Sequence, residues 1–524
     1  MAQHLSFGSV FVGKTAGAEE LTAERAAAEE VSESPMRILI VGNFHGAGQR
    51  RGTQAASPRP IMVDRDTIDE VLAKFHPMAR LEGIDPDGSP VEIEFMELDD
   101  FHPDRLYREL PLFDKLRDIR DRLESQTTFA DAAAEVRGWA EAHAVESKAK
   151  PGSEQAAEAN QSPAAAAPPS ISGENLLDQL LEHSEASPNE HEASRQSSVF
   201  DLLLEKVAGP YRIAADNPDK QPLVDLVNAL AADRLRAILH QPEFQAIESA
   251  WRSIDFLTRR VETDANLKLF VVDLPKETLA TDLDAVAGLR SSQLYKLLAD
   301  LPAGSSPWAM VVGNYEFAAT RDDVEMLGRI AQIAASASSP FVAGASPAVF
   351  GCPAPAERPD PDDWHEPDAT GAQMWRQLRS LPAATALALV SPRFLLRHPY
   401  GPGASETEEL EFIELPTPQH DGFLWGNGAF VAACLVAQAF GENGWNLNQN
   451  LGRDINDLPL HVYDDDGQPV VKPCAEALLG DRAAERILEF GIMPLLSFAD
   501  RGSVRLARLQ SLADPPAGLA GRWQ

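Results

Sequence analysis

The chain has 524 residues, and its 80 acidic against 46 basic residues give a formal net charge of −34 at neutral pH. Hydrophobic residues make up 44% of it, which is ordinary for a folded protein and supplies apolar surface for more than one core. Because phosphate backbones and anionic lipids attract basic surfaces, this charge disfavours nucleic acid and membrane surfaces as partners.

The sequence also indicates a compartment. The N-terminus has no basic region followed by an apolar run, so no secretory signal is predicted. The longest apolar stretch, residues 428–440, is too short to span a bilayer. Cys352, Cys434 and Cys474 are widely spaced and odd in number, which fits a reducing environment. We therefore predict a cytoplasmic protein.

The first part of the chain predicts a small α/β unit over residues 36–144, after a mobile lead-in over residues 1–35 that is rich in Ala and Glu. A continuous apolar run over residues 37–42 predicts a buried strand, and residues 61–63 predict a second one. Residues 91–95 alternate apolar and acidic side chains, as a half-exposed strand does.

Two amphipathic segments predict the helices of this unit. Asp66 is predicted to cap a helix whose inner face is Ile68, Val71, Leu72 and Phe75. A second helix is predicted after Pro103, with an inner face made of Leu106, Leu110, Phe113, Leu116 and Ile119. A further helical stretch is expected to extend the unit from about residue 123 to residue 144.

Residues 145–198 predict a disordered linker, since this Ala-, Pro-, Ser- and Glu-rich stretch has few large apolar side chains. Within it, residues 175–182 predict a short helix with one leucine face, formed by Leu176, Leu177, Leu180 and Leu181. A helix this short is marginal in water and should order only by docking. Docking on its own domain and binding in a partner's groove are equally consistent with the pattern.

A larger α/β domain is predicted over residues 199–524, because strand-like and helical patterns alternate there. Helices are expected over residues 223–239 and from Pro242, the second with an inner face of Phe244, Ile247, Trp251, Ile254 and Leu257. Buried strands are predicted at residues 267–272, 308–313 and 386–390. The Pro- and Asp-rich residues 352–371 predict a surface loop.

No pattern for catalysis, cofactor or metal binding emerges. The glycines of Gly42–Gly48 follow a strand but lack the Lys-Ser/Thr of a P-loop and the GxGxxG spacing. The 12 histidines show no paired ligand spacing, and Asp464–Gly467 looks like a hairpin turn. No GxSxG elbow is present. We therefore predict a protein that is not an enzyme and has no cofactor.

Specific segments resemble the contractile sheath proteins of type VI secretion systems. Residues 36–123 resemble the small-subunit family through MRILIVGNFHG, IMVDRDTIDEVLAKFHP and VEIEFMELDDFHPDRLYRELPLFDKLRDIRDRL. Residues 174–505 resemble the large-subunit family through ordered blocks that include LRAILHQPEFQAIESAWRSIDFL, WAMVVGNYEF, FLLRHPYG and FLWGNGAFVAACLVAQAFGENGW.

The resemblance implies a tail-sheath-like fold and a structural function, with sheath subunits and an inner-tube protein as partners. It also implies that the leucine helix is bound by an AAA+ unfoldase that recycles contracted sheath. Two features depart from the family: both subunit types occur in one chain, and the leucine helix is internal. The family's C-terminal region after about Phe498 is also expected to be missing.

Two functions follow as hypotheses. The first is a structural component or accessory of the contractile sheath, acting as a homo- or hetero-oligomer. The second is a non-polymerising adaptor that recruits an AAA+ unfoldase or regulates sheath assembly.

Overall fold

The computed structural model describes residues 7, 34–46, 59–85, 88–148, 220–286, 288–300, 306–352, 354–365, 368–403, 405–417, 419–447, 452–465 and 467–523. They group into two compact units, one formed by Met1–Leu110 with Arg234–Gln524 and the other by Pro111–Asp233. Most of the predicted linker and the leucine helix, with Leu176, Leu177, Leu180 and Leu181, lie outside the described residues.

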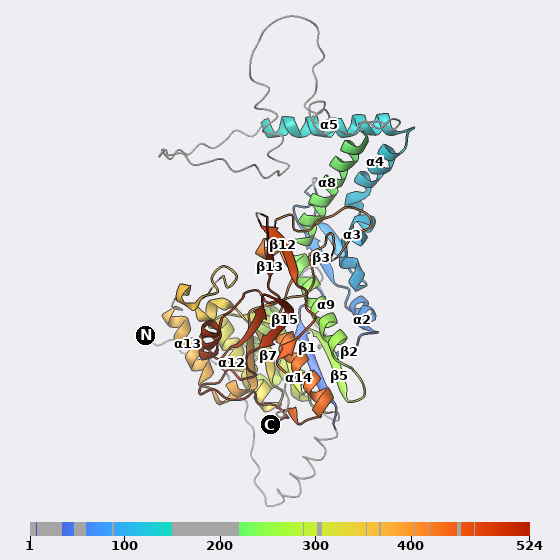
Figure 1. The fold of residues 1–524 in the computed structure, drawn as a ribbon. Coiled ribbons are helices and arrows are strands. Elements are labelled where there is room, and N and C mark those ends of the chain that lie inside the picture. The colour runs from blue at the N-terminus through green and yellow to red at the C-terminus, as the bar shows by residue number, and fades with distance from the viewer. Residues whose placement is uncertain are drawn as a thin grey trace, which may run out of the picture. The chain divides into compact units, whose positions relative to one another are not determined.

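The first unit is built on a nine-stranded sheet (Figure 1). The strands from β14 to β5 run parallel, and antiparallel strands close both edges. In spatial order the strands are β11 (Asp454–Ile455), β15 (Arg501–Leu506), β14 (Met493–Phe498), β8 (Leu387–Ser391), β7 (Phe341–Ala345), β6 (Met310–Phe317), β1 (Met36–Gly42), β5 (Leu267–Asp273) and β2 (Ile61–Val63).

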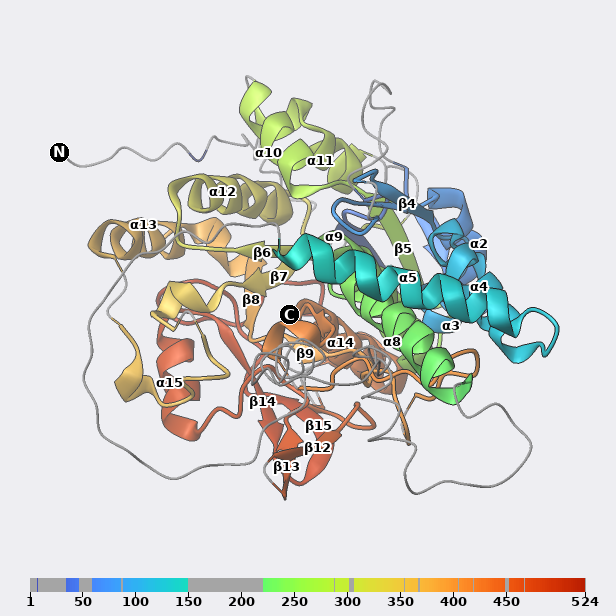
Figure 2. The ribbon, with the colours of Figure 1, turned by 90° about the horizontal axis from the view of Figure 1, so that it is seen from above.

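Helices cover both faces of this sheet (Figure 2). One face packs against a large apolar cluster with α12 at its centre, and the other packs against α14, which also contacts α9. The first layer contains α10 (Lys276–Ala285), α11 (Gln293–Tyr295), α12 (Arg321–Ser336), α13 (Ala369–Arg379) and α15 (Asp481–Glu489). The second layer contains α9 (Pro242–Arg260) and α14 (Ala429–Asn443). Because both faces are covered, the parallel strands are almost continuously apolar.

Shorter elements complete the first unit. Three two-stranded antiparallel sheets pair β3 with β4, β9 with β10 and β12 with β13. Their bounds are β3 (Met78–Leu81), β4 (Val91–Glu94), β9 (Phe394–Leu395), β10 (Trp425–Gly426), β12 (His461–Asp465) and β13 (Gln468–Lys472). The last pair confirms the predicted hairpin, with Gly467 at a positive φ of 80°.

The second unit is helical. It contains α4 (Asp114–Glu124), α5 (Phe129–Lys148) and α8 (Lys220–Leu239) as far as Asp233. The Arg122 guanidinium binds Glu135 at 3.0 Å between α4 and α5, and Lys220 Nζ donates to the Glu124 carbonyl at 3.3 Å. The mixed α/β class is confirmed, while the predicted domain boundaries stay a prediction.

Two local predictions were wrong. The first helix, α2 (Ile68–Phe75), has Thr67 and not Asp66 at its N-cap. The carboxylate that fixes this turn belongs to Asp64 and not to Asp66, since Asp64 Oδ1 accepts the amides of Asp66 at 3.0 Å and of Thr67 at 2.9 Å. The predicted inner face is nevertheless buried.

The helix after Pro103 is also interrupted. It divides into α3 (Pro103–Glu109), a short 3₁₀ turn (Pro111–Phe113) and α4. Pro111 has no amide proton and disfavours helical backbone at the residue before it, and Leu110 is extended with ψ of 128°. The five apolar residues predicted as one inner face are all buried, but they come from separate elements.

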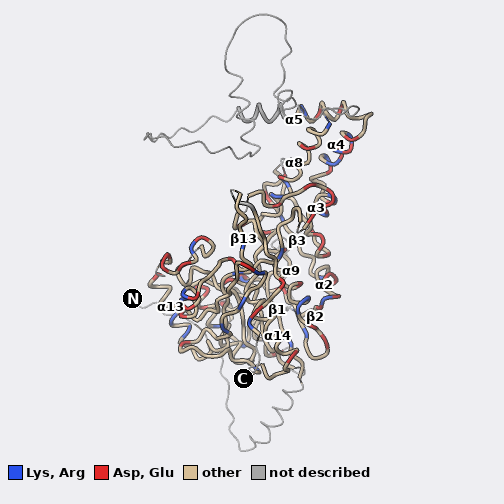
Figure 3. The backbone as a smooth tube through the Cα atoms, in the orientation of Figure 1, with Lys and Arg blue, Asp and Glu red and all other residues tan. Residues whose placement is uncertain are grey.

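Charged residues are interspersed along both units (Figure 3). Lys and Arg alternate with Asp and Glu on the described helices, as the sequence of α4, DKLRDIRDRLE, illustrates. Within the described residues, no helix combines the length and apolarity that crossing a membrane requires.

Phe7, near the start of the given sequence, contacts α12 at a glycine. A Cβ added to Gly328 would lie 2.0 Å from Phe7 Cδ1, so the absence of a side chain there makes room for the ring. The Gln332 side-chain amide donates to the Phe7 carbonyl at 2.9 Å, one turn further along α12. The helix therefore holds Phe7 by both its ring and its backbone.

Replacing Gly328 with Ala should displace Phe7 while leaving the fold intact, because the added methyl clashes with the ring but favours helix by about 1 kcal/mol. We expect chymotrypsin to cleave after Phe7 at least several-fold faster, as measured by mass spectrometry. Gly441→Ala is the matched control, since a Cβ on that α14 glycine meets nothing within 4 Å. An unchanged cleavage rate in the Gly328 variant would contradict the contact.

Candidate functional site

Within the first unit, residues 36–110 pack against residues 234–524 through an extensive interface of strands, rings and hydrogen bonds. Its centre is β1, which lies between β5 and β6. Seven residues of β1 pair with β5, from Met36 opposite Leu267 to Gly42 opposite Asp273. The side chains of Ile38, Leu39, Ile40 and Val41 are fully buried. The small-subunit-like segment thus supplies an inner strand to the sheet of the large-subunit-like part.

The turn after β1 is fixed by a carboxylate of β5. Asp273 Oδ1 accepts the backbone amide of Phe44 at 2.7 Å and that of His45 at 3.3 Å. These amides belong to the Gly42–Gly48 loop, in which a phosphate cradle would need free donors. Gly46, at φ 79°, could not carry a Cβ, because that atom would lie 2.4 Å from the Met78 carbonyl oxygen.

Aromatic side chains fill the space between this turn and α9. Phe44, Phe75 and Trp251 contact one another edge to face, with ring centroids 5.5–6.1 Å apart. The Trp251 indole nitrogen donates to the Phe44 carbonyl at 3.1 Å, which satisfies both buried polar groups. This confirms Trp251 as a core residue and shows what it holds in place.

A second aromatic group lies further along the same interface. Phe95 and Phe101 are stacked with centroids 4.2 Å apart, and both meet Phe244 of α9 edge to face. All three rings are fully buried. Since aromatic pairs contribute beyond their area, the two groups together anchor the segment on α9.

Backbone polar groups are paired across the interface as well. Glu243 at the start of α9 accepts the Arg80 amide of β3 at 3.2 Å. Asp104 near the start of α3 accepts the amides of Glu408 and Glu409 at 2.9 and 3.1 Å. The interface therefore combines strand pairing, ring packing and hydrogen bonds that link distant parts of the sequence.

Beside this interface lies a buried ionic cluster centred on Arg397. Its guanidinium binds Glu248 of α9 at 2.8 Å and Glu414 at 2.7 Å, and both carboxylates are almost completely buried. Arg252 also binds Glu248, at 2.6 Å, and donates to the Tyr400 hydroxyl at 3.0 Å. Each buried charge thus has a partner of opposite sign, which burial demands.

The cluster shifts the pKa of its members. Burial alone would raise the pKa of Glu248, but the charges and hydrogen bonds of Arg397 and Arg252 hold it below its usual value. Burial likewise opposes the charge of Arg397, yet Glu248 and Glu414 raise its pKa well above the ordinary value. Both groups therefore stay charged at neutral pH.

A ring contact connects the cluster with the small-subunit-like segment. The imidazole of His102, at the N-cap of α3, packs edge to face on Tyr400 with centroids 4.9 Å apart. Burial lowers the pKa of His102, although the charge of Asp104 opposes that shift. A neutral imidazole suits this position, because a cation there would face Arg252 and Arg397.

A second buried carboxylate, Glu476, lies outside the interface. It binds Arg393 through both oxygens, at 2.5 and 3.1 Å, and contacts His420 at 3.0 Å. Burial would raise the pKa of Glu476, but the hydrogen bonds from His420 and Arg393 lower it to about 2. Its contribution to stability is therefore complete above its ordinary pKa of 4.5 and is lost as the pH falls toward 2.

We expect Glu476→Gln to lower the free energy of unfolding by about 3 kcal/mol at pH 7, as the size of the pKa shift requires. The deficit should shrink as the pH falls below 4.5, where the wild-type carboxylate loses its advantage. Urea unfolding at a series of pH values measures it. Asp454→Asn, in an exposed pair with Arg505, should cost less than about 1 kcal/mol. A deficit that is constant with pH would refute the assignment.

The sequence-predicted site cannot be compared with the contacts described above, because its residues are not among those that the structure describes. The four leucines lie outside the described residues, so their role stays a prediction. No group of three His, Cys, Asp or Glu side chains suited to a metal occurs in the part of the chain that the structure describes. The ionic cluster was missed, although its Arg397 lies in the FLLRHPYG block and its Glu248 in the block around Trp251.

Comparison with known proteins agrees with this architecture. The family model VipB, described as EvpB/VC_A0108, tail sheath N-terminal domain, matches residues 221–513, more than half of the chain. The model T6SS_VipA, described as Type VI secretion system, VipA, VC_A0107 or Hcp2, matches residues 20–143.

A curated relative is the type VI secretion system sheath protein TssC1 of Pseudomonas aeruginosa. It is 31% identical over 313 residues, which cover 56% of this chain and 61% of the relative. The chain thus spans about three fifths of the length of the protein it matches. The match of the VipB model over more than half of the sequence establishes that the chain belongs to this tail sheath family, with a VipA-like segment in the same polypeptide.

Proposed function

We propose that the chain is a structural component or accessory of a type VI contractile sheath, in which one polypeptide forms the small- and large-subunit parts of a protomer. The observation that supports this is the position of β1. A strand from the VipA-like segment lies inside the sheet of the VipB-like part, hydrogen-bonded on both sides. The role is non-catalytic and cytoplasmic.

Joining the two parts in one polypeptide would favour assembly of the protomer. Separate subunits must meet at their cellular concentrations, whereas a covalent connection turns that meeting into an intramolecular step with an effective concentration up to the millimolar range. A joined protomer also keeps a one-to-one ratio of its two parts. The buried apolar surfaces then serve adhesion within the protomer, and the remaining exposed surfaces are left for sheath subunits and the inner-tube protein.

Electron microscopy tests the proposal. The purified chain would be mixed with the separate sheath subunits and tube protein of its own host, and the assemblies imaged by negative stain with a gold-labelled tag on the chain. Label along the sheath identifies a component, and label confined to sheath ends identifies an accessory. If the label associates with neither sheath nor tube, the proposal is wrong.

The leucine helix is proposed as the handle for an AAA+ unfoldase. We expect Leu177→Asp with Leu180→Asp to abolish capture of that unfoldase in a pull-down, because charge on the leucine face prevents groove binding. Gln179→Asp, at a position off the leucine face, is the matched control and should bind normally. Equal capture by all three proteins would remove the helix from the recycling step and with it the adaptor function.

A further inference from the structure

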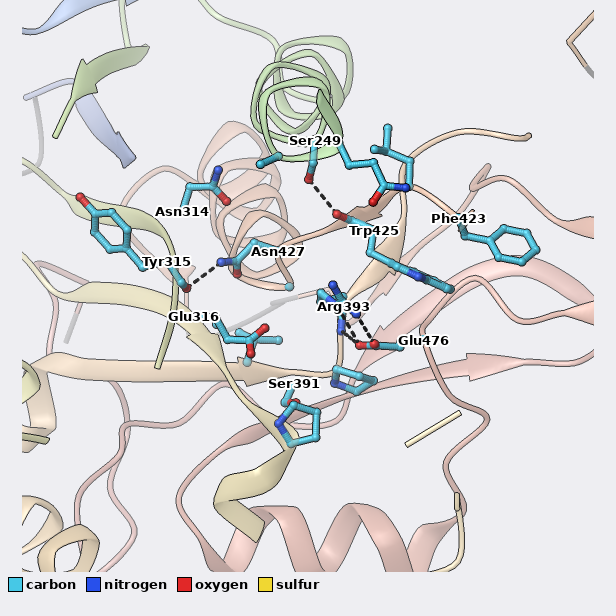
Figure 4. A pocket seen from close by; sticks show the side chains of 18 of the residues that line it. Ser249, Asn314, Tyr315, Glu316, Ser391, Arg393, Phe423, Trp425, Asn427 and Glu476 are labelled. Atoms are coloured by element: carbon cyan, nitrogen blue, oxygen red, sulfur yellow. Dashed lines mark hydrogen bonds and ion pairs between the residues drawn. The ribbon is translucent and has the colours of Figure 1, made fainter. Parts of the chain in front are cut away.

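A pocket of about 580 Å³ opens at the carboxyl ends of β6, β7 and β8 (Figure 4). The start of α9 forms its opposite wall, through residues such as Gln245 and Ser249. In parallel sheets the crevice beyond the carboxyl ends of the strands is where ligands bind, and this volume lies in the usual range of binding sites. Neither the β1 interface nor the Arg397 cluster uses it.

The floor of the pocket contains a buried polar group without a partner. Ser391, the last residue of β8, is 1% exposed, and its hydroxyl has no hydrogen-bond partner among the described residues. Next to it, Arg393 is held by the bidentate Glu476 contact, so the guanidinium cannot swing away. Buried hydroxyls are nearly always hydrogen-bonded, so one that lines a pocket without a partner in the described part of the protein is available to a bound molecule.

The walls carry an excess of negative charge. Glu316 and Asp421 line the pocket, and neither carboxylate has a hydrogen bond or ion pair within the described part of the chain. Figure 4 shows the Glu316 side chain directed toward Arg393. With Glu476 they set three carboxylates against one guanidinium among the lining residues.

The surroundings do not cancel that excess. Burial opposes the charge of Arg393, but Glu476, Glu316 and Asp421 raise its pKa above the ordinary value. Two lysines lie nearby. Lys276 Nζ donates to the Glu316 carbonyl at 2.6 Å, but its charge is paired with Asp323 at 2.6 Å. Lys472 Nζ lies 5.1 Å from the Phe423 ring centroid and 5.5 Å from that of Trp425. One more positive charge in the pocket would therefore be electrostatically favoured.

A second pocket adjoins the first. A neighbouring pocket of about 310 Å³ shares His240 and Asp421 with the first and extends along Leu415 and Pro416. We call these two adjoining pockets the groove, and their arrangement on either side of the shared Asp421 suits an elongated ligand better than one small molecule. An extended peptide has this shape, and its side chains can enter successive hollows.

We propose that this groove binds an extended segment of a partner protein and that an arginine or lysine of the segment enters the larger pocket between Glu316 and Asp421. The aromatic side chains of Phe423 and Trp425 cover the aliphatic part of the basic side chain, and the carboxylates bind its charged end. The segment belongs to a second protein, because a chain of net charge −34 selects partners of the opposite sign. This site is independent of whether the chain joins a sheath.

Selection from a random library tests the proposal without knowing the partner. A phage-displayed library of random 12-residue peptides would be panned on the full chain, and enriched peptides would be synthesised and measured by calorimetry. The test variant is Glu316→Gln with Asp421→Asn. The control is Asp66→Asn with Glu442→Gln, which changes the net charge equally at exposed carboxylates outside the groove.

We expect the enriched peptides to share an arginine or lysine, to bind the test variant at least tenfold more weakly, and to bind the control variant as they bind the wild type. Replacing that basic residue with citrulline or norleucine should have the same effect as the test variant. The proposal is overturned if no peptide is enriched, if the enriched peptides lack a basic residue, or if both variants bind equally. The four substituted side chains are exposed, so both variants should fold normally. Equal melting temperatures of the wild type and the two variants would confirm this.

Discussion

Ile40→Asp is expected to prevent folding of the first unit, with a loss of more than about 4 kcal/mol in the free energy of unfolding. Ile40 is fully buried in β1 and pairs with Val271 on one side and Val312 on the other. A carboxylate at this position must leave water for the apolar interior between Val271 and Val312, and burying a charge is among the few changes that cost this much. The variant should accumulate as insoluble protein or show no cooperative thermal transition.

Two controls separate the charge from the position. Ile40→Val removes one methylene and should cost about 1 kcal/mol, leaving a soluble protein with a lowered melting temperature. Met62→Asp places the same charge on β2, at the edge of the sheet, where the side chain is 52% exposed. It should change stability by less than about 1 kcal/mol.

The outcome decides how the two parts of the chain are related. If β1 is an inner strand, its disruption unfolds the VipB-like part as well, since that part loses hydrogen bonds on both β5 and β6. If the VipA-like segment folded separately, Ile40→Asp would leave a native VipB-like part that still shows a cooperative transition. That second result would remove the observation on which the proposed protomer depends.

The strands and helices could be predicted from local patterns. Predominantly apolar runs at residues 37–42, 267–272 and 308–313, in which Arg37 and Lys268 are the charged exceptions, became β1, β5 and β6. Strands buried on both faces have little polar surface to alternate with. The helix ends were less predictable. The polar turn before α2 depends on a choice between Asp64 and Asp66, and only the backbone path of the turn decides it.

The neighbours of each strand could not be predicted. Nothing in residues 36–42 indicates that this strand lies between β5 and β6, whose residues follow more than two hundred positions later. The Arg397 cluster could not be predicted for the same reason, since Glu248 lies 149 positions from Arg397 in the sequence. Residue spacing in the sequence can reveal a site within one helix or strand. It cannot reveal residues from distant segments that become neighbours only in the folded protein.

The same cluster gives the second large effect, for Arg397→Leu. Removing the guanidinium leaves Glu248 with Arg252 alone and deprives Glu414 of its two contacts with Arg397. Breaking a buried ion pair from one side typically costs about 3–5 kcal/mol, because the remaining charge stays desolvated. We expect a loss in this range at pH 7, measured by urea unfolding.

A matched exposed pair serves as the control. Arg259→Leu makes the same substitution in an ion pair with Asp255 on α9, where the arginine side chain is 55% exposed. Solvent screens that pair, so its loss should cost less than about 1 kcal/mol. Similar losses for both variants would show that the buried ion pairs of Arg397 stabilise the fold no more than an exposed pair does, which would contradict the prediction.

The pH dependence of the loss identifies the buried carboxylate as its cause. In the wild type the lowered pKa of Glu248 contributes stability that is present above the ordinary value of 4.5 and is lost as the pH falls through the folded pKa. Without Arg397, burial outweighs the remaining attraction and raises the pKa of Glu248, so the variant is stabilised by protonation. The difference between the two proteins must therefore narrow as the pH is lowered from 7 toward 4. A difference that stays constant or widens over that range would mean that Glu248 is not the group left uncompensated.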